Sequence, residues 1–255
     1  MDESLLPDPP LLPTRAKPSR GRKIVRAIGW VSVIAGVLVL GFVVQQVFVT
    51  SWLAERNQVA LEEDAREYFG DVEVVEVPLA EVLEDAAPSG DGETTAVTPD
   101  DMRTLLVESP PEAHQPFAII RAPGITALED GWTVVEGVER ADLKNGAGHM
   151  SHTPIPGQPG NAVISGHRTT YGAPFHDLDL LEPGDRIEVE TGLGIHGYEV
   201  RETIIVDPFA LWVTEPRQGA WLTLTTCHPK FSSQERMVLF AELVDGPNAE
   251  SILAS

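Results

Sequence analysis

Residues 221–237 have the sequence WLTLTTCHPKFSSQERM, in which two β-strand patterns flank a short polar loop. The first strand is expected to end at Cys227, the loop to cover His228–Glu235, and the second strand to begin near Arg236. If these strands pair as a hairpin, Cys227 and Arg236 lie opposite each other with Cβ atoms about 5 Å apart. Alternation along the first strand places the thiol on the face away from the two leucines. The stretch therefore predicts a hairpin that holds one thiol beside one guanidinium.

Short strand patterns bounded by glycine and proline recur through the second half of the chain. They are Phe117–Ile120, Trp132–Val135, Ala162–Ser165, Arg186–Val189, Tyr198–Val206, Trp221–Thr226 and Met237–Val244. A helical stretch is expected near Pro174–Leu181. Seven or eight short strands within residues 116–246 predict a mostly antiparallel barrel or sandwich around one core.

The glycine-rich segment 192–197, with the sequence GLGIHG, fits the dinucleotide-binding pattern G-x-G-x-x-G. That phosphate cradle requires a helix after the glycines, whereas a strand pattern, Tyr198–Val206, follows here. We therefore expect a hairpin turn at this segment, and no cofactor is predicted.

The N-terminal part combines a basic tail with a long apolar run. Residues 1–26 hold six basic residues and five prolines and are expected to form a disordered tail. Residues 27–49 carry no charged side chain, and as a helix they would measure about 35 Å, enough to cross a hydrocarbon core of about 30 Å. The apolar region of a cleaved signal peptide is shorter. We expect a single transmembrane helix with a cytoplasmic N-terminus, which places residues 50–255 outside the cell.

Charge is distributed unevenly along the chain. The 255 residues include 18 Lys and Arg against 39 Asp and Glu, a formal net charge of −21. This balance argues against nucleic-acid binding, which requires clustered basic side chains. Residues 50–115 are rich in acids and are expected to form an acidic extracellular stalk. Residues 116–246 form the expected compact domain, and 247–255 a short C-terminal tail.

Cys227 is the only cysteine, which excludes an internal disulfide, a Cys-rich zinc module and a Cys-x-x-Cys redox pair. A neighbouring guanidinium would favour the thiolate or donate hydrogen bonds to an oxyanion. The strand Ala162–Ser165 leads to His167, and an imidazole beside a thiol can protonate a leaving amine. His149 and His152 have no accompanying cluster of acids or cysteines, so no metal is predicted. From the residues alone, Cys227 could also be a small buried hydrophobic residue.

Taken together, these motifs resemble the sortase family. Thr223-Leu-Thr-Thr-Cys227 is similar to the sortase signature T-L-x-T-C, with an arginine nine residues later, and His167 precedes it in the family's order of His, Cys and Arg. The strings Ser165-Gly-His-Arg-Thr-Thr-Tyr171 and Cys227-His-Pro229 resemble class E sortases of high-GC Gram-positive bacteria. The resemblance covers approximately residues 117–244.

The resemblance implies a closed eight-stranded β-barrel and a membrane-anchored cysteine transpeptidase. Cys227 would attack the Thr–Gly bond of a C-terminal sorting signal of the LAxTG or LPxTG type, His167 would be the general acid/base, and Arg236 would bind substrate or stabilise the oxyanion. The implied partners are secreted proteins that carry this signal. The implied acceptor is an amine such as that of lipid II or a pilin lysine.

Two other readings of the sequence stay open. One is another thiol-dependent enzyme of peptidoglycan, such as an L,D-transpeptidase, although its usual motif places His and Gly before the cysteine, where this chain has Thr225-Thr226. The other is a non-catalytic anchored binding domain with an inert thiol. The rate of thiol labelling separates a catalytic thiolate from a buried thiol.

Overall fold

The computed structural model describes residues 20–45, 50–86 and 103–254 of the protein. The strands are β1 (Val74–Pro78), β2 (Thr104–Glu108), β3 (Pro116–Arg121), β4 (Trp132–Glu136), β5 (Ala147–His149), β6 (Gly160–Ser165), β7 (Arg186–Thr191), β8 (Gly194–Val206), β9 (Ala220–His228) and β10 (Glu235–Asp245). The helices are α1 (Arg20–Val44), α2 (Thr50–Asp71), α3 (Leu79–Ala86), α4 (Asp142–Asn145) and α5 (Ala249–Leu253), with 3₁₀ turns η3 (Leu178–Leu180) and η4 (Leu211–Thr214).

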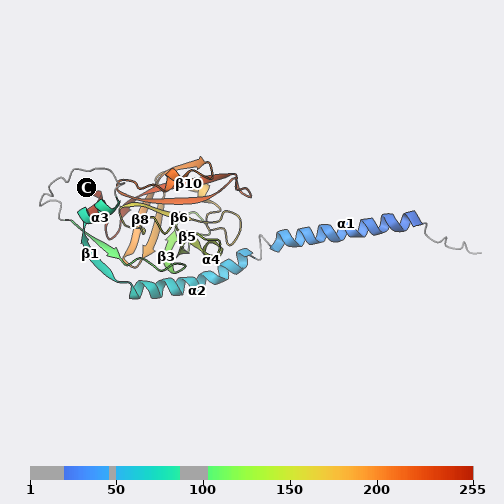
Figure 1. Ribbon diagram of the computed structural model, residues 1–255, viewed down its shortest axis with the longest axis horizontal. Helices are drawn as coiled ribbons and strands as arrows, with labels where there is room; N and C mark the ends of the chain where they lie inside the picture. Colours follow the sequence, from blue (N-terminus) through green and yellow to red (C-terminus); the bar gives the residue numbers. More distant parts are fainter. Residues whose placement is uncertain (1–19, 46–49, 87–102, 255) are drawn as a thin grey trace, which may run out of the picture. The chain divides into compact units, whose positions relative to one another are not determined.

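Within the described residues, eight strands close a barrel in the order β10-β8-β7-β3-β4-β5-β6-β9 (Figure 1). Most neighbours are antiparallel, but β4 pairs with β5 and β6 pairs with β9 in parallel. The predicted closed eight-stranded barrel is confirmed. Each of the seven predicted strands lies within an observed one, while the short strand β5 was not predicted.

The barrel core follows the alternation of the strands. On β9, Leu222 and Leu224 are fully buried in the core, whereas Trp221, Thr225 and Cys227 are only half-buried. A two-residue period is expected of a strand with one apolar face. Thr223 departs from it, since this residue is also buried and its Oγ1 donates to Asn161 Oδ1.

The turn between β7 and β8 lies at the start of the glycine-rich segment 192–197, and the rest of that segment belongs to β8. Thr191 pairs with Gly194, so Gly192 and Leu193 form the tip of a hairpin. A strand follows the glycines, as predicted, and the segment offers no helix N-terminus to a phosphate.

The helix expected near Pro174–Leu181 is reduced to the single 3₁₀ turn η3. Phe175, Leu178 and Leu181 are all buried, at intervals of three residues. That spacing suits a 3₁₀ turn as well as an α-helix, and the sequence pattern does not separate the two.

The described part of segment 50–115 is folded against the barrel and does not form the extended stalk expected from its acidic composition. Helix α2 lies along β3, β4 and α4 (Figure 1). Ala54 and Ala65 are buried in this contact, and Gln58 bridges to the barrel by accepting from the Thr133 backbone N–H at 2.9 Å and donating to the Asn145 carbonyl at 2.7 Å. Small side chains at the contact allow a charged helix to pack closely. Residues 87–102 of this segment lie outside the described residues.

Strands β1 and β2 form a separate two-stranded antiparallel sheet. The side chain of Asn248 fixes β2 to the rest of the fold, since it accepts from the Leu106 N–H at 2.9 Å and donates to the Leu106 carbonyl at 2.8 Å. Gln158 donates to the same carbonyl at 2.8 Å. The β1–β2 sheet is thus held by side chains from two distant loops.

Helix α1 has 25 residues and no buried side chain, and it lies in a compact unit separate from the barrel. It is long and apolar enough to cross a membrane. Its start at Arg20 makes residues 20–26 helical, although they were expected to belong to a disordered tail. Residues 1–19 of that tail, and residues 46–49 of the predicted span, lie outside the described residues.

Candidate active site

The parallel pairing of β6 and β9 places the segments of His167 and Cys227 at the same end of the barrel. Ser165 pairs with Thr225, so His167 and Cys227 each follow a paired residue by two positions. Two hydrogen bonds extend the pairing beyond the strand: the Gly166 N–H donates to the Thr225 carbonyl at 3.0 Å, and Thr226 Oγ1 donates to the Gly166 carbonyl at 2.8 Å. His167 and Cys227 therefore lie at the adjacent ends of two neighbouring strands.

The hairpin of β9 and β10 has the register predicted from the sequence. Cys227 is directly opposite Arg236, and His228 is opposite Glu235. Directly opposed residues point to the same face of the sheet, so the thiol and the guanidinium stem share one side of the barrel wall. The Cys227 side chain is half-buried and the cysteine is free.

The guanidinium of Arg236 is held at the mouth of this hairpin by backbone oxygens. Its Nη1 donates to the Ser233 carbonyl at 3.1 Å and to the Glu235 carbonyl at 3.0 Å. Among the described residues no carboxylate forms an ion pair with it. Its charge is therefore available to an anion or a developing oxyanion near Cys227.

His167 is half-buried, and its ring lies 5.0 Å from the Tyr171 ring, centroid to centroid. Its carbonyl accepts from the Phe175 N–H at 3.2 Å, which fixes the backbone of the turn that follows. Burial lowers the pKa of His167, because desolvation disfavours the charged imidazolium. At neutral pH the ring is thus in the neutral form, which can accept a proton from a neighbouring thiol.

Arg168 was not singled out from the sequence, yet its guanidinium connects the His167 segment to the Cys227 strand. It is only 3% exposed. Its Nη1 donates to His228 Nδ1 at 2.9 Å and to the Cys227 carbonyl at 3.4 Å, and its Nη2 lies 2.8 Å from Asp179 Oδ1. The only signal in the sequence was the position of this arginine, directly after the predicted catalytic histidine. Its importance follows from its burial in the structure, because buried arginines are rare unless they are paired.

None of the described residues forms a cluster of three or more His, Cys, Asp or Glu side chains suited to a metal ion. A half-buried imidazole, a half-buried thiol and two arginines at one end of the barrel suit nucleophilic attack on a carbonyl. The thiol supplies the nucleophile, the imidazole moves protons, and a guanidinium offers donors to the oxyanion.

Comparison with known proteins shows which proteins the barrel domain is similar to. The family model of the Sortase domain matches residues 123–244. The chain is 30% identical over 147 residues to sortase SrtE1 of Streptomyces coelicolor, covering 52% of this chain and 42% of that protein. It is 35% identical over 120 residues to sortase D of Bacillus subtilis, and this match covers 47% of this chain and 58% of that protein. The chain spans about half the length of the curated relatives it matches.

Among solved structures, the sortase E of Streptomyces avermitilis is similar to this chain at 32% identity. The match covers 52% of this chain and 91% of that one, with a TM-score of 0.47.

Proposed function

This chain belongs to the sortase family, with class E proteins among its relatives, and from that premise we propose that it is a membrane-anchored cysteine transpeptidase. It cleaves a C-terminal sorting signal of the LAxTG or LPxTG type between Thr and Gly, and it transfers the protein to a cell-wall amine. The observation that carries the proposal is the convergence of the Cys227, His167 and Arg236 segments at one end of the barrel.

In the first half-reaction, Cys227 Sγ attacks the threonine carbonyl carbon while the neutral His167 imidazole accepts the thiol proton. Negative charge then collects on the carbonyl oxygen, where Arg236 donates hydrogen bonds. The C–N bond to glycine breaks, the sulfur remains bonded to the threonine carbonyl carbon, and His167 gives its proton to the glycine nitrogen. The product is a thioester on Cys227 and a free glycine amine.

In the second half-reaction, the acceptor amine attacks the thioester carbonyl. His167 takes the proton that the amine loses, the C–S bond breaks, and the proton returns to sulfur. The acceptor is an amine such as that of lipid II or a pilin lysine.

Membrane attachment follows from the chemistry of the substrates. Both the sorting-signal protein and a lipid-linked acceptor are confined near the outer face of the cell membrane. The apolar helix α1 would hold the enzyme at the same surface. The basic residues of its first turns, Arg20, Arg22, Lys23 and Arg26, would keep that end in the cytoplasm by the positive-inside rule.

The test uses the full-length protein in lipid nanodiscs with two quenched peptides, one with an LAxTG core and one with LPxTG, and an added amine. Mass spectrometry follows cleavage and the acyl-transfer product. We expect Cys227-dependent cleavage with transfer, and no product from Cys227→Ala. If neither peptide is cleaved while the thiol reacts rapidly with a label, another thiol enzyme of the wall is favoured. If the thiol is also inert, the domain binds without catalysis.

A further inference from the structure

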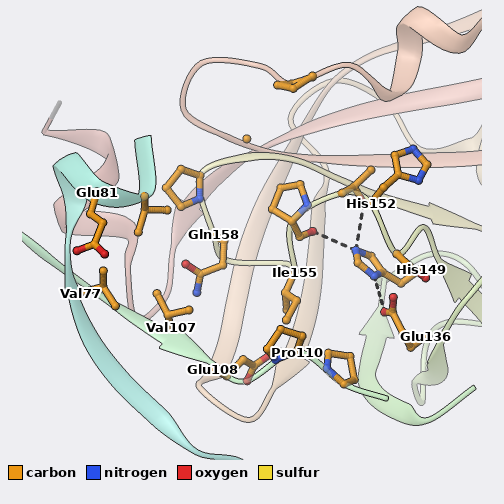
Figure 2. A pocket seen from close by; sticks show the side chains of 18 residues that line it. Val77, Glu81, Val107, Glu108, Pro110, Glu136, His149, His152, Ile155 and Gln158 are labelled. Atoms are coloured by element: carbon orange, nitrogen blue, oxygen red, sulfur yellow. Dashed lines mark hydrogen bonds and ion pairs between the residues drawn. The ribbon is translucent and has the colours of Figure 1, made fainter. Parts of the chain in front are cut away.

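Figure 2 shows a pocket of about 640 Å³. It lies at the end of β6 opposite to the candidate active site. Gly160, the first residue of β6, lines it, whereas Ser165 at the far end of that strand pairs with Thr225 beside the thiol. Five residues of strand separate these positions by about 17 Å. His167, Cys227 and Arg236 do not line the pocket, which is therefore a separate site.

Most of the pocket wall is apolar. Aliphatic side chains come from β1, α3, β2 and the β5–β6 loop, and prolines come from the loops between them. These residues are Val77, Val82, Val107, Ile155, Pro110, Pro111, Pro154, Pro159 and Pro216. Such a wall suits the hydrocarbon part of a ligand.

The buried carboxylate of Glu108 has one oxygen bound and one without a partner. The side chain is 1% exposed, and its Oε2 accepts from the Leu193 N–H at 3.1 Å in the β7–β8 turn. Its Oε1 is buried without a hydrogen-bond partner among the described residues. The turn thus orients the carboxylate, and a buried acceptor left unpaired is costly.

Gln158, in the β5–β6 loop, also combines a side-chain group that is hydrogen-bonded with an oxygen that has no partner. It is 7% exposed, and its Nε2 donates to the Leu106 carbonyl at 2.8 Å. Its Oε1 has no hydrogen-bond partner among the described residues. Gln158 and Glu108 both line the pocket (Figure 2), so two unpaired groups of the lining are both acceptors.

A second acid of the pocket lining, Glu136, is paired with a histidine. Its Oε2 lies 2.7 Å from His149 Nδ1, and His149 Nε2 lies 3.0 Å from the Pro154 carbonyl (Figure 2). The third neighbour, Thr153 Oγ1, uses its hydrogen on the Met150 carbonyl. Glu136 therefore has a hydrogen-bond partner within the fold, the His149 ring.

Glu108 is thus left without a cation. Glu81 is a third acid of the lining, after Glu108 and Glu136, and among the described residues of the lining there is no Lys or Arg. Burial raises the pKa of Glu108 to about 7, as expected for a carboxylate that lacks a positive partner.

We propose that this pocket binds a primary ammonium group on an apolar stem. The ammonium donates to Glu108 Oε1 and Gln158 Oε1, and the stem packs against the valines, Ile155 and the prolines. An ammonium group has three donors and no acceptor, which matches two unpaired acceptors, and its charge balances Glu108. An anionic ligand would meet uncompensated acids, and a purely apolar ligand would leave both oxygens unpaired.

The test titrates full-length protein in nanodiscs, with labelled Val and Ile methyl groups, with n-pentylamine, n-pentanol and pentanoate. We expect the Val107 and Ile155 methyl signals to shift saturably with n-pentylamine. We expect n-pentanol to bind at least tenfold more weakly and pentanoate not to bind. Glu108→Gln should weaken n-pentylamine binding at least tenfold, since hydrogen bonds to charged groups exceed neutral ones by about that factor. Glu182→Gln, an exposed acid outside the pocket, is the matched control.

Non-saturating shifts, equal binding of the amine and the alcohol, or wild-type affinity in Glu108→Gln would overturn the proposal. If Glu108→Gln does not fold, Ile155→Phe replaces it. This variant narrows the pocket while retaining both acceptors, and it should abolish the saturable shift of Val107. The readout is binding at a site remote from Cys227, so the result is independent of peptide cleavage.

Discussion

Arg168 Nη1 lies 3.4 Å from the Cys227 carbonyl oxygen and 2.9 Å from His228 Nδ1. A buried guanidinium that directly follows His167 therefore reaches across the parallel seam between β6 and β9. This contact joins the His167 segment to the Cys227 strand in addition to the strand pairing.

Replacement of Arg168 by lysine should reduce peptide cleavage, because an ammonium cannot reach Asp179, His228 and the Cys227 carbonyl together. We expect kcat to fall about tenfold or more, with a smaller change in KM, and the folded state to lose about 1–3 kcal/mol. The alkylation rate of Cys227 measured against pH reports on the site itself. A purely structural role would lower the melting temperature but leave that pH profile unchanged. Arg201→Lys, at an exposed arginine paired with Glu242, is the control.

The thiol itself should be dispensable for folding and essential for turnover. Cys227 is half-buried at the end of β9, so Cys227→Ala removes little packed surface. We expect no cleavage or transfer product and a thermal midpoint within a few degrees of the wild type, measured by circular dichroism. Loss of the β signal in this variant would instead identify a structural thiol.

Arg236→Lys should also be severely impaired. The guanidinium is positioned by the Ser233 and Glu235 carbonyls, and a lysine retains the charge without the planar set of donors. Loss of one donor to an oxyanion typically costs about 10²–10³ in kcat. Single-turnover acylation by a sorting-signal peptide measures this step. A rate within twofold of wild type would remove Arg236 from the proposed mechanism.

His196 makes stability depend on pH. It is fully buried, its Nε2 lies 3.1 Å from Thr191 Oγ1, and burial lowers its pKa to about 4. The unfolded chain has the ordinary value of about 6.5, so it binds more protons than the folded state between these two pH values. The contribution of the buried neutral ring, about 3 kcal/mol, is present above pH 6.5 and is lost as the pH falls towards 4.

The measurement compares thermal midpoints at pH 7.5 and pH 5 in the wild type and in His196→Gln, which keeps a polar contact to Thr191. The variant should lose less stability on acidification. Glu108 acts in the opposite direction, because its raised pKa of about 7 makes the folded state bind more protons in the same range. The difference between the two proteins therefore isolates His196. An equal loss in both would contradict the assignment.

The Cys227–Arg236 register was predicted because it follows from local information, whereas the strand patterns left a barrel or a sandwich open and the family resemblance implied the closed barrel. Alternating burial along β9 and a short loop determine which residues of a hairpin face each other. The pairing of β6 with β9 could not be read in this way, since parallel strands are separated by a long crossover. The family resemblance supplied His167 where periodicity did not.

The folding of α2 against the barrel was missed for a different reason. Its buried residues are the alanines Ala54 and Ala65, which give a weak apolar pattern among many acids. The acidic composition of residues 50–115 indicated that the segment is exposed to solvent. The contact instead depends on the small alanine side chains and on polar side chains such as Gln58. The periodicity of the sequence likewise did not indicate a role for Arg168, because that role depends on partners about 60 residues away.

The parallel seam between β6 and β9 also determines when the molecule acquires its reactivity. A chain that has been synthesised only as far as β8 contains His167 but neither Cys227 nor Arg236. Strand β9 must enter between β6 and β10 before the ring of strands is complete. The same pairing of β9 therefore closes the barrel and brings the Cys227 segment beside the His167 segment, and long-range pairings of this kind are slow to form. Incompletely folded chains at the membrane surface would expose a thiol without the groups that activate it.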